Sequence, residues 1–256
     1  MRLYIVLFDQ TMKSIAVYCG SSAGTNPLYI TQAQALAAAM VAQNLTLVYG
    51  GGRVGLMGTI ADAVLALGGQ VVGVIPDFLA NKELAHLGCT ELHVVKSMHE
   101  RKLMMADRAD GFIAMPGGYG TLEELFEVLT WGQLGLHQKP VALLNVDGYY
   151  DHLLLALDRM RDDQLLRAEN RDQLLQSPDP QELLAQLAAY VPVALLNVDG
   201  YYDHLLLALD RMRDDQLLRA ENRGQLLQSP DPAELLAQMA AYQPVQMEKW
   251  LTPPTT

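Results

Sequence analysis

Short apolar segments alternate with Ala- and Leu-rich segments along the first 146 residues, and this alternation limits the fold more than any other feature. The apolar segments comprise residues 14–19, 45–49, 70–75, 91–95, 111–115 and 141–146. Their continuous apolar character predicts strands that are covered on both faces. The segments between them, such as 31–43 and 58–68, have the length of crossover helices. The sequence therefore predicts an α/β fold with a doubly wound, mostly parallel sheet and helices on both faces.

Glycine-rich loops follow three of the predicted strands. They comprise residues 20–24, 50–53 and 116–121, after the first, second and fifth strands. Ligands of doubly wound sheets bind beyond the carboxyl ends of the strands. We therefore expect these three loops to meet at one edge of the sheet and to form the ligand site.

The carboxyl-terminal half contains a tandem repeat of 52 residues. Pro140–Val191 and Pro192–Gln243 align without gaps and differ at four positions, Asp172/Gly224, Gln181/Ala233, Leu187/Met239 and Val191/Gln243. Two such similar copies indicate a recent or artificial duplication, since a solenoid needs about three or more repeats. We expect the first copy to complete the sheet, because it follows the core directly. The second copy could add an edge strand, exchange into a partner subunit, or pack loosely.

These features suggest a division of the chain into four parts. Residues 12–191 are expected to form one domain, 192–243 its duplicated segment and 244–256 a tail. Residues 1–11 precede a second methionine, Met12, and are interpreted as an extension that a misassigned start codon would explain.

Composition and charge argue against several classes of protein. Most of the net charge of −11 lies in the two repeat copies, and no basic run or basic–aromatic patch points to nucleic acid. The apolar runs are too short to cross a membrane, and the N-terminus lacks a secretory signal, so we expect a cytoplasmic protein. The two cysteines and six histidines show no ligand spacing, so neither a metal site nor a disulfide framework is expected.

The loop at residues 50–55 reads Gly-Gly-Gly-Arg-Val-Gly and formally matches the GxGxxG dinucleotide motif. That motif normally follows the first strand, whereas here it follows the second, and the acidic residue Asp77 comes late. Three interpretations stay open: a dinucleotide site, a tight turn with close helix packing, or a nucleotide or phosphate contact through Gly51 and Gly52.

A second loop, residues 115–125, joins a strand to an amphipathic helix and reads MPGGYGTLEEL. Free N–H groups and the positive end of the helix would suit a phosphate group. There is an alternative in which Thr121 and Glu124 form only a capping box and Glu123 only favours the helix dipole.

The segment 97–102 predicts another helix start, with Ser97 and Glu100 as a capping box. Arg101 and Lys102 follow at once, although cations oppose the dipole at this end of a helix. An anionic ligand would explain them, and a solvated basic pair is the alternative.

Three motifs together resemble the Lonely Guy (LOG) family of cytokinin riboside 5′-monophosphate phosphoribohydrolases. They are GGGRVGLMG at 50–58, MHERK at 98–102 and PGGYGTLEE at 116–124. The resemblance runs from about residue 13 through the first repeat copy. It implies a Rossmann-like subunit, usually a homodimer, that needs no cofactor and releases a free base and ribose 5-phosphate from an adenine-type nucleotide. Similar families are often labelled lysine decarboxylases, but no lysine here has a recognisable setting for pyridoxal phosphate.

The resemblance also implies roles for individual residues. Arg101 and Glu124 match the catalytic pair. The matching nucleotide-binding positions are Glu83, Lys102, Gly117, Gly118, Tyr119, Gly120, Thr121, Leu122, Glu123 and Thr130.

The chemistry of N-glycosidic cleavage fits these residue types. Breaking a ribosyl C–N bond develops oxocarbenium character, which a carboxylate such as Glu124 can stabilise while it orients or deprotonates water. Arg101 would hold the substrate by forked hydrogen bonds. Two alternatives are a non-catalytic nucleotide-binding or carrier protein and a nicotinamide-dependent oxidoreductase.

Overall fold

The computed structural model describes residues 12–80, 84–189, 194–214 and 226–240. These residues belong to two compact units. The larger unit is Met12–Gln133 with Lys139–Ala188, and the smaller one contains the second repeat copy. The expected extension 1–11 and tail 244–256 lie outside the described residues.

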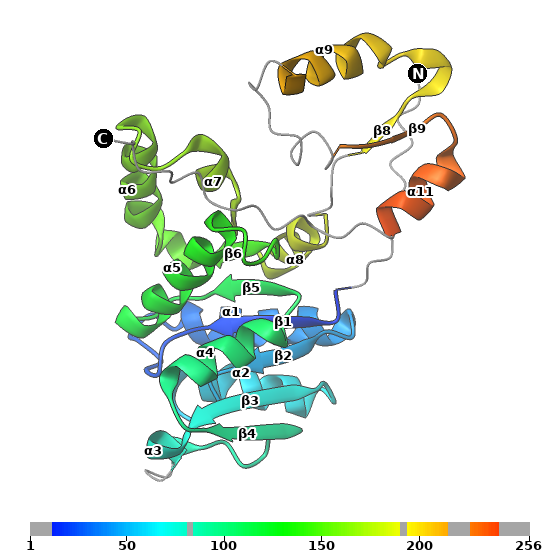
Figure 1. The fold of residues 1–256 in the computed structure, drawn as a ribbon. Helices are drawn as coiled ribbons and strands as arrows, with labels where there is room; N and C mark the ends of the chain where they lie inside the picture. Colours follow the sequence, from blue (N-terminus) through cyan, green and yellow to red (C-terminus); the bar gives the residue numbers. More distant parts are fainter. Residues whose placement is uncertain (1–11, 81–83, 190–193, 215–225, 241–256) are drawn as a thin grey trace. The chain divides into compact units, whose positions relative to one another are not determined.

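The larger unit is built on a seven-stranded, all-parallel sheet with the strand order β4-β3-β2-β1-β5-β6-β7 (Figure 1). The strands are β1 (Ser14–Tyr18), β2 (Thr46–Tyr49), β3 (Val71–Pro76), β4 (Glu91–Val95), β5 (Gly111–Ala114), β6 (Val141–Leu144) and β7 (Leu174–Ser177). The chain runs outward from β1 to β4 and then crosses to β5 on the other side of β1. The point where the strand order reverses therefore lies between β1 and β5.

Helices cover both faces of this sheet, so the predicted doubly wound architecture is confirmed. They are α1 (Leu28–Ala42), α2 (Gly55–Ala66), α3 (Asp77–Leu79), α4 (Met98–Asp107), α5 (Tyr119–Gln133), α6 (Asp151–Asp162), α7 (Ala168–Asp172) and α8 (Pro180–Ala188). One buried cluster joins one face of the sheet to α1, α2 and α8, and a second joins the other face to α4, α5 and α6. Ile15 of β1 lies in the first cluster and the adjacent Ala16 in the second, which explains why both are apolar.

The six strands expected from the sequence are all present, with bounds that differ by at most two residues from the predicted segments. The seventh strand, β7, was not predicted. Its sequence, Leu-Leu-Gln-Ser, contains only two apolar residues and pairs along one edge, with β6. An edge strand needs less apolar surface than a central one, so its pattern is weak.

Both repeat copies fold locally in the same way. In the first copy β6 pairs with β7, and Ala142 lies opposite Leu175. In the second copy β8 (Ala194–Leu196) pairs with β9 (Leu227–Ser229), and Ala194 lies opposite Leu227 in the same register. The second copy also contains α9 (Asp203–Asp214) and α11 (Pro232–Ala240), and α11 contacts both β8 and β9. The first copy therefore supplies β6 and β7 of the large sheet, whereas β8 and β9 form a sheet of two strands.

Candidate active site

The loops after β1, β2 and β5 meet at one edge of the sheet, as the sequence predicts. The N–H of Gly20 donates to the Pro116 carbonyl at 3.1 Å, which joins the loops after β1 and β5. The N–H of Leu56, at the start of α2, donates to the Gly20 carbonyl at 3.1 Å. These bonds bring all three loops to the place where the strand order reverses, which is the usual ligand site of such sheets.

Helix α5 starts earlier than the capping-box interpretation requires. It begins at Tyr119, and the N–H of Leu122 donates to the Gly118 carbonyl at 3.1 Å. Thr121 therefore lies inside the first turn and is buried, and the carboxylate of Glu124 points to another helix. The capping-box alternative is wrong because Gly118, rather than Thr121, occupies the position that starts the helix.

The glycines of this loop differ in the space around them. A β-carbon on Gly117 would collide with the Thr121 side chain and lie 2.9 Å from the Gly20 nitrogen, so packing requires Gly117. A β-carbon on Gly118 or Gly120 would meet nothing within 4 Å. Open space thus lies before the first turn of α5, whose N–H groups have no partner within the helix.

Helix α4 carries the second predicted motif and begins at Met98. The Ser97 hydroxyl accepts the Glu100 N–H at 3.2 Å, as a capping residue should. The Glu100 carboxylate accepts the N–H of Lys96 at 2.8 Å, one residue earlier than the reciprocal bond of a capping box. This cap fixes the start of α4 and so the direction of the next two side chains.

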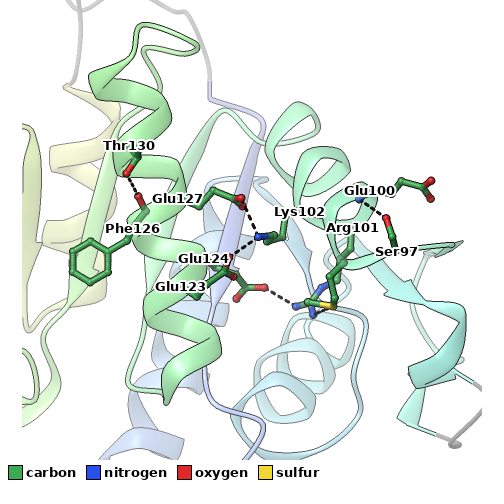
Figure 2. Close-up of polar contacts among 10 residues, drawn as sticks. Ser97, Glu100, Arg101, Lys102, Glu123, Glu124, Phe126, Glu127 and Thr130 are labelled. Atoms are coloured by element: carbon green, nitrogen blue, oxygen red, sulfur yellow. Dashed lines mark hydrogen bonds and ion pairs between the residues drawn. The ribbon is translucent and has the colours of Figure 1, made fainter.

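Arg101 of α4 and Glu124 of α5 form a buried ion pair (Figure 2). Arg101 Nη2 donates to Glu124 Oε1 at 2.7 Å, and both side chains are about nine-tenths buried, with 11% and 9% exposed. A β-carbon on Gly50 would collide with the guanidinium, so the loop after β2 leaves room for it. Arg101 Nε is buried and has no hydrogen-bond partner among the described residues. The guanidinium thus keeps one free donor beside the glycine-rich loops.

Lys102 also points to α5. Its Nζ donates to Glu123 Oε1 at 2.5 Å and to Glu127 Oε1 at 2.9 Å. Burial alone would lower the pKa of Lys102, but the hydrogen bonds that its ammonium donates to the two carboxylates outweigh it and the pKa is raised. The solvated-pair alternative is therefore wrong: Lys102 and Arg101 are buried, and the carboxylates of α5 compensate their charge.

The surroundings of Glu124 disfavour its charged form. Burial raises the pKa of this carboxyl above its ordinary value, and Glu123 and Glu127 act in the same direction. Arg101 opposes the shift but does not cancel it. Glu124 is therefore a buried carboxyl that can exchange a proton nearer neutral pH than an exposed glutamate can.

Comparison with known proteins identifies the family of this chain. The family model described as "Possible lysine decarboxylase" matches residues 57–187. Cytokinin riboside 5′-monophosphate phosphoribohydrolase LOG5 of Arabidopsis thaliana is 49% identical over 181 residues, which cover 71% of this chain and 79% of that protein. LOG1 of the same plant is 47% identical over 184 residues, covering 72% and 86%. The chain belongs to the LOG family.

Solved structures show the same fold at lower identity. A molybdenum cofactor binding protein from Rippkaea orientalis superimposes with a TM-score of 0.53 and 21% identity, covering 70% of this chain and 96% of that chain. The molybdenum cofactor carrier protein of Chlamydomonas reinhardtii gives 0.53 and 20%, covering 70% and 99%. This similarity concerns the fold alone.

The remaining positions that the LOG resemblance implies are placed apart from the Arg101–Glu124 pair or lie outside the described residues. Thr130 lies nearly two turns beyond Glu123 on α5, and its hydroxyl donates to the Phe126 carbonyl at 2.6 Å (Figure 2). Glu83 lies outside the described residues.

Gly51 and Gly52 have structural partners in this LOG-family fold. The Gly51 carbonyl accepts the His86 N–H at 2.9 Å, and Gly52 forms an antiparallel bridge with Ala85. The dinucleotide interpretation of this loop is wrong for a physical reason. The N–H groups of Leu56 and Met57, which would hold a pyrophosphate at the start of α2, already point to the Gly20 carbonyl.

The description "lysine decarboxylase" has no support at Lys102, the lysine beside the ion pair. A Schiff-base lysine must lose its proton, and burial or cationic neighbours normally lower its pKa for this purpose. Lys102 has the opposite setting, with two carboxylates and a raised pKa.

Four residues near the site were not singled out in the sequence. Glu127 shares a face of α5 with Glu123 and Glu124, a relation that helical spacing could have revealed. Gly50 makes room for Arg101. Tyr149 and Tyr150 donate to carbonyls of the loop before α5. Only the packing of the first repeat copy against the sheet reveals these last contacts.

Two further observations concern the described residues alone. They contain no group of three or more His, Cys, Asp or Glu side chains placed to hold a metal ion. None of their helices is long and apolar enough to cross a membrane.

Proposed function

We propose that this protein hydrolyses the N-glycosidic bond of an adenine-type nucleoside 5′-monophosphate, with cytokinin riboside 5′-monophosphate or AMP as substrate. The products are the free base and ribose 5-phosphate. The observation that carries the proposal is the buried Arg101–Glu124 pair beside the glycine-rich loop, in a chain about half identical to LOG enzymes.

Glu124 is the proposed catalytic carboxylate. Cleavage of the C1′–N bond sends the bonding electrons to the base and leaves an oxocarbenium-like sugar. The Glu124 carboxylate stabilises this charge and accepts a proton from the water that attacks C1′. That proton then passes to the departing base, so atoms and charge balance. The raised pKa of Glu124 makes it a stronger base than an exposed glutamate carboxylate.

Arg101 is proposed to act in two ways. Its Nη2 holds the Glu124 carboxylate in one orientation at 2.7 Å. Its side chain is 11% exposed, and guanidinium N–H groups other than the buried Nε donate to the ribose hydroxyl or phosphate oxygens of the substrate. A guanidinium suits both tasks because its donors form a rigid fork.

The phosphate is proposed to lie at the start of α5. The N–H groups of Tyr119, Gly120 and Thr121, in the first turn of α5, carry the positive end of the helix dipole, which favours an anion. Gly118 and Gly120 leave the approach open, and a β-carbon at either would occupy that space.

The other candidate positions are proposed to support the site or to contact the substrate at its edge. Lys102 is already paired with Glu123 and Glu127, so it orders the acidic face of α5 and contributes positive charge. Gly117 and Leu122 shape the loop. Glu83 and Thr130 are proposed substrate contacts on the family resemblance alone, and Gly51 and Gly52 on the nucleotide or phosphate interpretation of their loop.

The test is incubation of the purified chain with AMP and with N6-prenylated AMP, following the free base by chromatography. We expect release by the wild type and none by Glu124→Gln. Glu169→Gln, at an exposed position of α7 outside the proposed site, is the control and should retain activity. Binding without release by the wild type would instead identify a nucleotide carrier.

We further propose that the protein is a homodimer, as the LOG resemblance implies, and that it acts in the cytoplasm. Light scattering on the purified chain tests the oligomeric part. A mass of one chain would contradict it.

A further inference from the structure

Two tyrosines of the first repeat copy hold the loop between β5 and α5. Tyr150 is buried and donates its hydroxyl to the Met115 carbonyl at 2.6 Å. Tyr149 donates to the Gly117 carbonyl, also at 2.6 Å, and its side chain reaches the surface. Two carbonyls of the loop therefore accept hydrogen bonds from tyrosines. One of them, the Gly117 carbonyl, belongs to the peptide unit that joins Gly117 to Gly118.

The hydrogen bond from Tyr149 also fixes the direction of the N–H group in the Gly117–Gly118 peptide. A peptide unit is planar and almost always trans, so its C=O and N–H point in opposite directions. Tyr149 draws the Gly117 carbonyl to one side. The N–H of Gly118, in the same peptide, is therefore directed away from Tyr149 and cannot turn unless the hydrogen bond breaks.

Tyr149 is itself held firmly. Its ring packs edge-to-face against Tyr29 and Tyr150, with ring centroids 5.7 and 4.9 Å apart. The turn before it contains Asp147, whose φ of +52° is left-handed and whose carboxylate accepts from Asn26 Nδ2 at 3.0 Å. The hydroxyl is therefore presented to Gly117 by a rigid support.

We infer that Tyr149 is a positioning residue for the 5′-phosphate. Its hydrogen bond to Gly117 orients the Gly118 N–H toward the open space before α5. This inference rests on the proposed function, since it assigns the phosphate of a nucleotide to that space. Tyr149 does not touch the substrate; it acts through the loop.

The repeat supplies a matched control within the same chain. Tyr201 is the counterpart of Tyr149, and it has the same neighbours in sequence. It packs edge-to-face on Tyr202 at 4.9 Å and follows Asp199, whose φ is +51°. Its side chain is 74% exposed, against 42% for Tyr149. Removal of the same hydroxyl from two near-identical sequences therefore isolates the contact with the loop.

The experiment compares Tyr149→Phe and Tyr201→Phe with the wild type. It measures kcat and KM for AMP, and inhibition by ribose 5-phosphate and by adenine. We expect Tyr149→Phe to raise KM and the ribose 5-phosphate inhibition constant about three- to tenfold, as loss of one hydrogen bond predicts, while kcat and adenine inhibition change less than about twofold. Tyr201→Phe should leave all four values unchanged.

Several outcomes would overturn the inference. An unchanged ribose 5-phosphate constant in Tyr149→Phe would do so, and so would equal losses for ribose 5-phosphate and adenine, which indicate general damage to the site. If the wild type released no base, the hydrolase would be refuted, and calorimetric titration with ribose 5-phosphate would still decide the role of Tyr149. If the wild type bound no ribose 5-phosphate, both proposals would fail.

Discussion

Arg101, near the start of α4, donates to Glu124, near the start of α5, at 2.7 Å. Both side chains are about nine-tenths buried. Burying two charges costs several kcal/mol per ion unless their mutual attraction and hydrogen bonds offset it. Here one guanidinium donor, Nε, stays unsatisfied among the described residues. A pair placed for stability alone would satisfy this group, so the pair is costly to fold and is better explained by a role in the chemistry of the site.

The first prediction concerns the Glu124 carboxylate. Glu124→Gln keeps the shape of the side chain but removes the proposed base, so kcat should fall by about 10²–10⁴-fold while AMP binding is retained. Base release and calorimetric titration measure the two quantities. Glu169→Gln, at an exposed position of α7 outside the proposed site, should keep kcat within a few fold. Equal activity of Glu124→Gln and the wild type would exclude Glu124 as the base.

The second prediction concerns pH. Burial raises the pKa of Glu124 above its ordinary value of 4.5. The proposed active form is the carboxylate, so kcat/KM must fall as the pH decreases through that raised pKa. The midpoint of the acid limb should therefore lie above pH 4.5, and the limb should be absent from the residual activity of Glu124→Gln. A wild-type midpoint at or below 4.5 would contradict this assignment.

The loop glycines give a third prediction, because packing and binding make different demands on them. Gly118→Ala adds a methyl group to open space, so the melting temperature should stay within about 2 °C of the wild type. The methyl group would obstruct the phosphate, and loss of one charge-assisted hydrogen bond should raise KM for AMP about 10- to 100-fold. Gly117→Ala must displace Thr121 or Gly20 and should destabilise the fold by about 1–3 kcal/mol. If Gly118→Ala lowered the melting temperature but left KM for AMP unchanged, the space before α5 would bind no phosphate.

The sequence predicted the sheet well and the contacts of the site less well. Five of the six predicted strands are central, covered on both faces and continuously apolar, and the edge strand β4 still contains three apolar residues, whereas β7, at the other edge, carries only two leucines. The motifs identified Arg101 and Glu124 as residues, but their pairing depends on how α4 packs beside α5, which no local pattern encodes. The residue type of Thr121 suits a cap and left the capping-box alternative open, yet the helix begins at Tyr119 because the Gly118 carbonyl accepts its first bond.

The fourth prediction concerns Lys102, whose ammonium is buried between two carboxylates. Lys102→Met would leave Glu123 and Glu127 close together without a cation. The expected loss in the free energy of unfolding is about 1–3 kcal/mol, less than for a fully buried pair because Glu123 is half-exposed. Urea denaturation measures it. Arg159→Met is the control, since the exposed Arg159–Asp163 pair should contribute less than about 1 kcal/mol. Equal effects of the two substitutions would refute a structural role for Lys102.

The last prediction concerns the repeat. Removal of residues 192–243 should leave the seven-stranded sheet and base release intact, because β6 and β7 both come from the first copy. Removal of 140–191 should also give a folded enzyme, since Lys139 then joins Pro192 and an almost identical sequence follows β5. The one core change, Leu187 to the methionine of the second copy, conserves volume and should cost less than about 1.5 kcal/mol, a few degrees in melting temperature.

A chain that lacks both copies is the control for these deletions. Without β6 the edge of β5 is uncovered, and Phe112 and Ile113, now fully buried, lose their neighbours on that side. This control should not unfold cooperatively in thermal melts followed by circular dichroism. The deletion of 140–191 tests whether the second copy can replace the first. To do so, the second copy must restore the sheet and, through Tyr201, the hydrogen bond to Gly117. If that chain folds but binds ribose 5-phosphate as weakly as Tyr149→Phe, the second copy restores the sheet without restoring the loop.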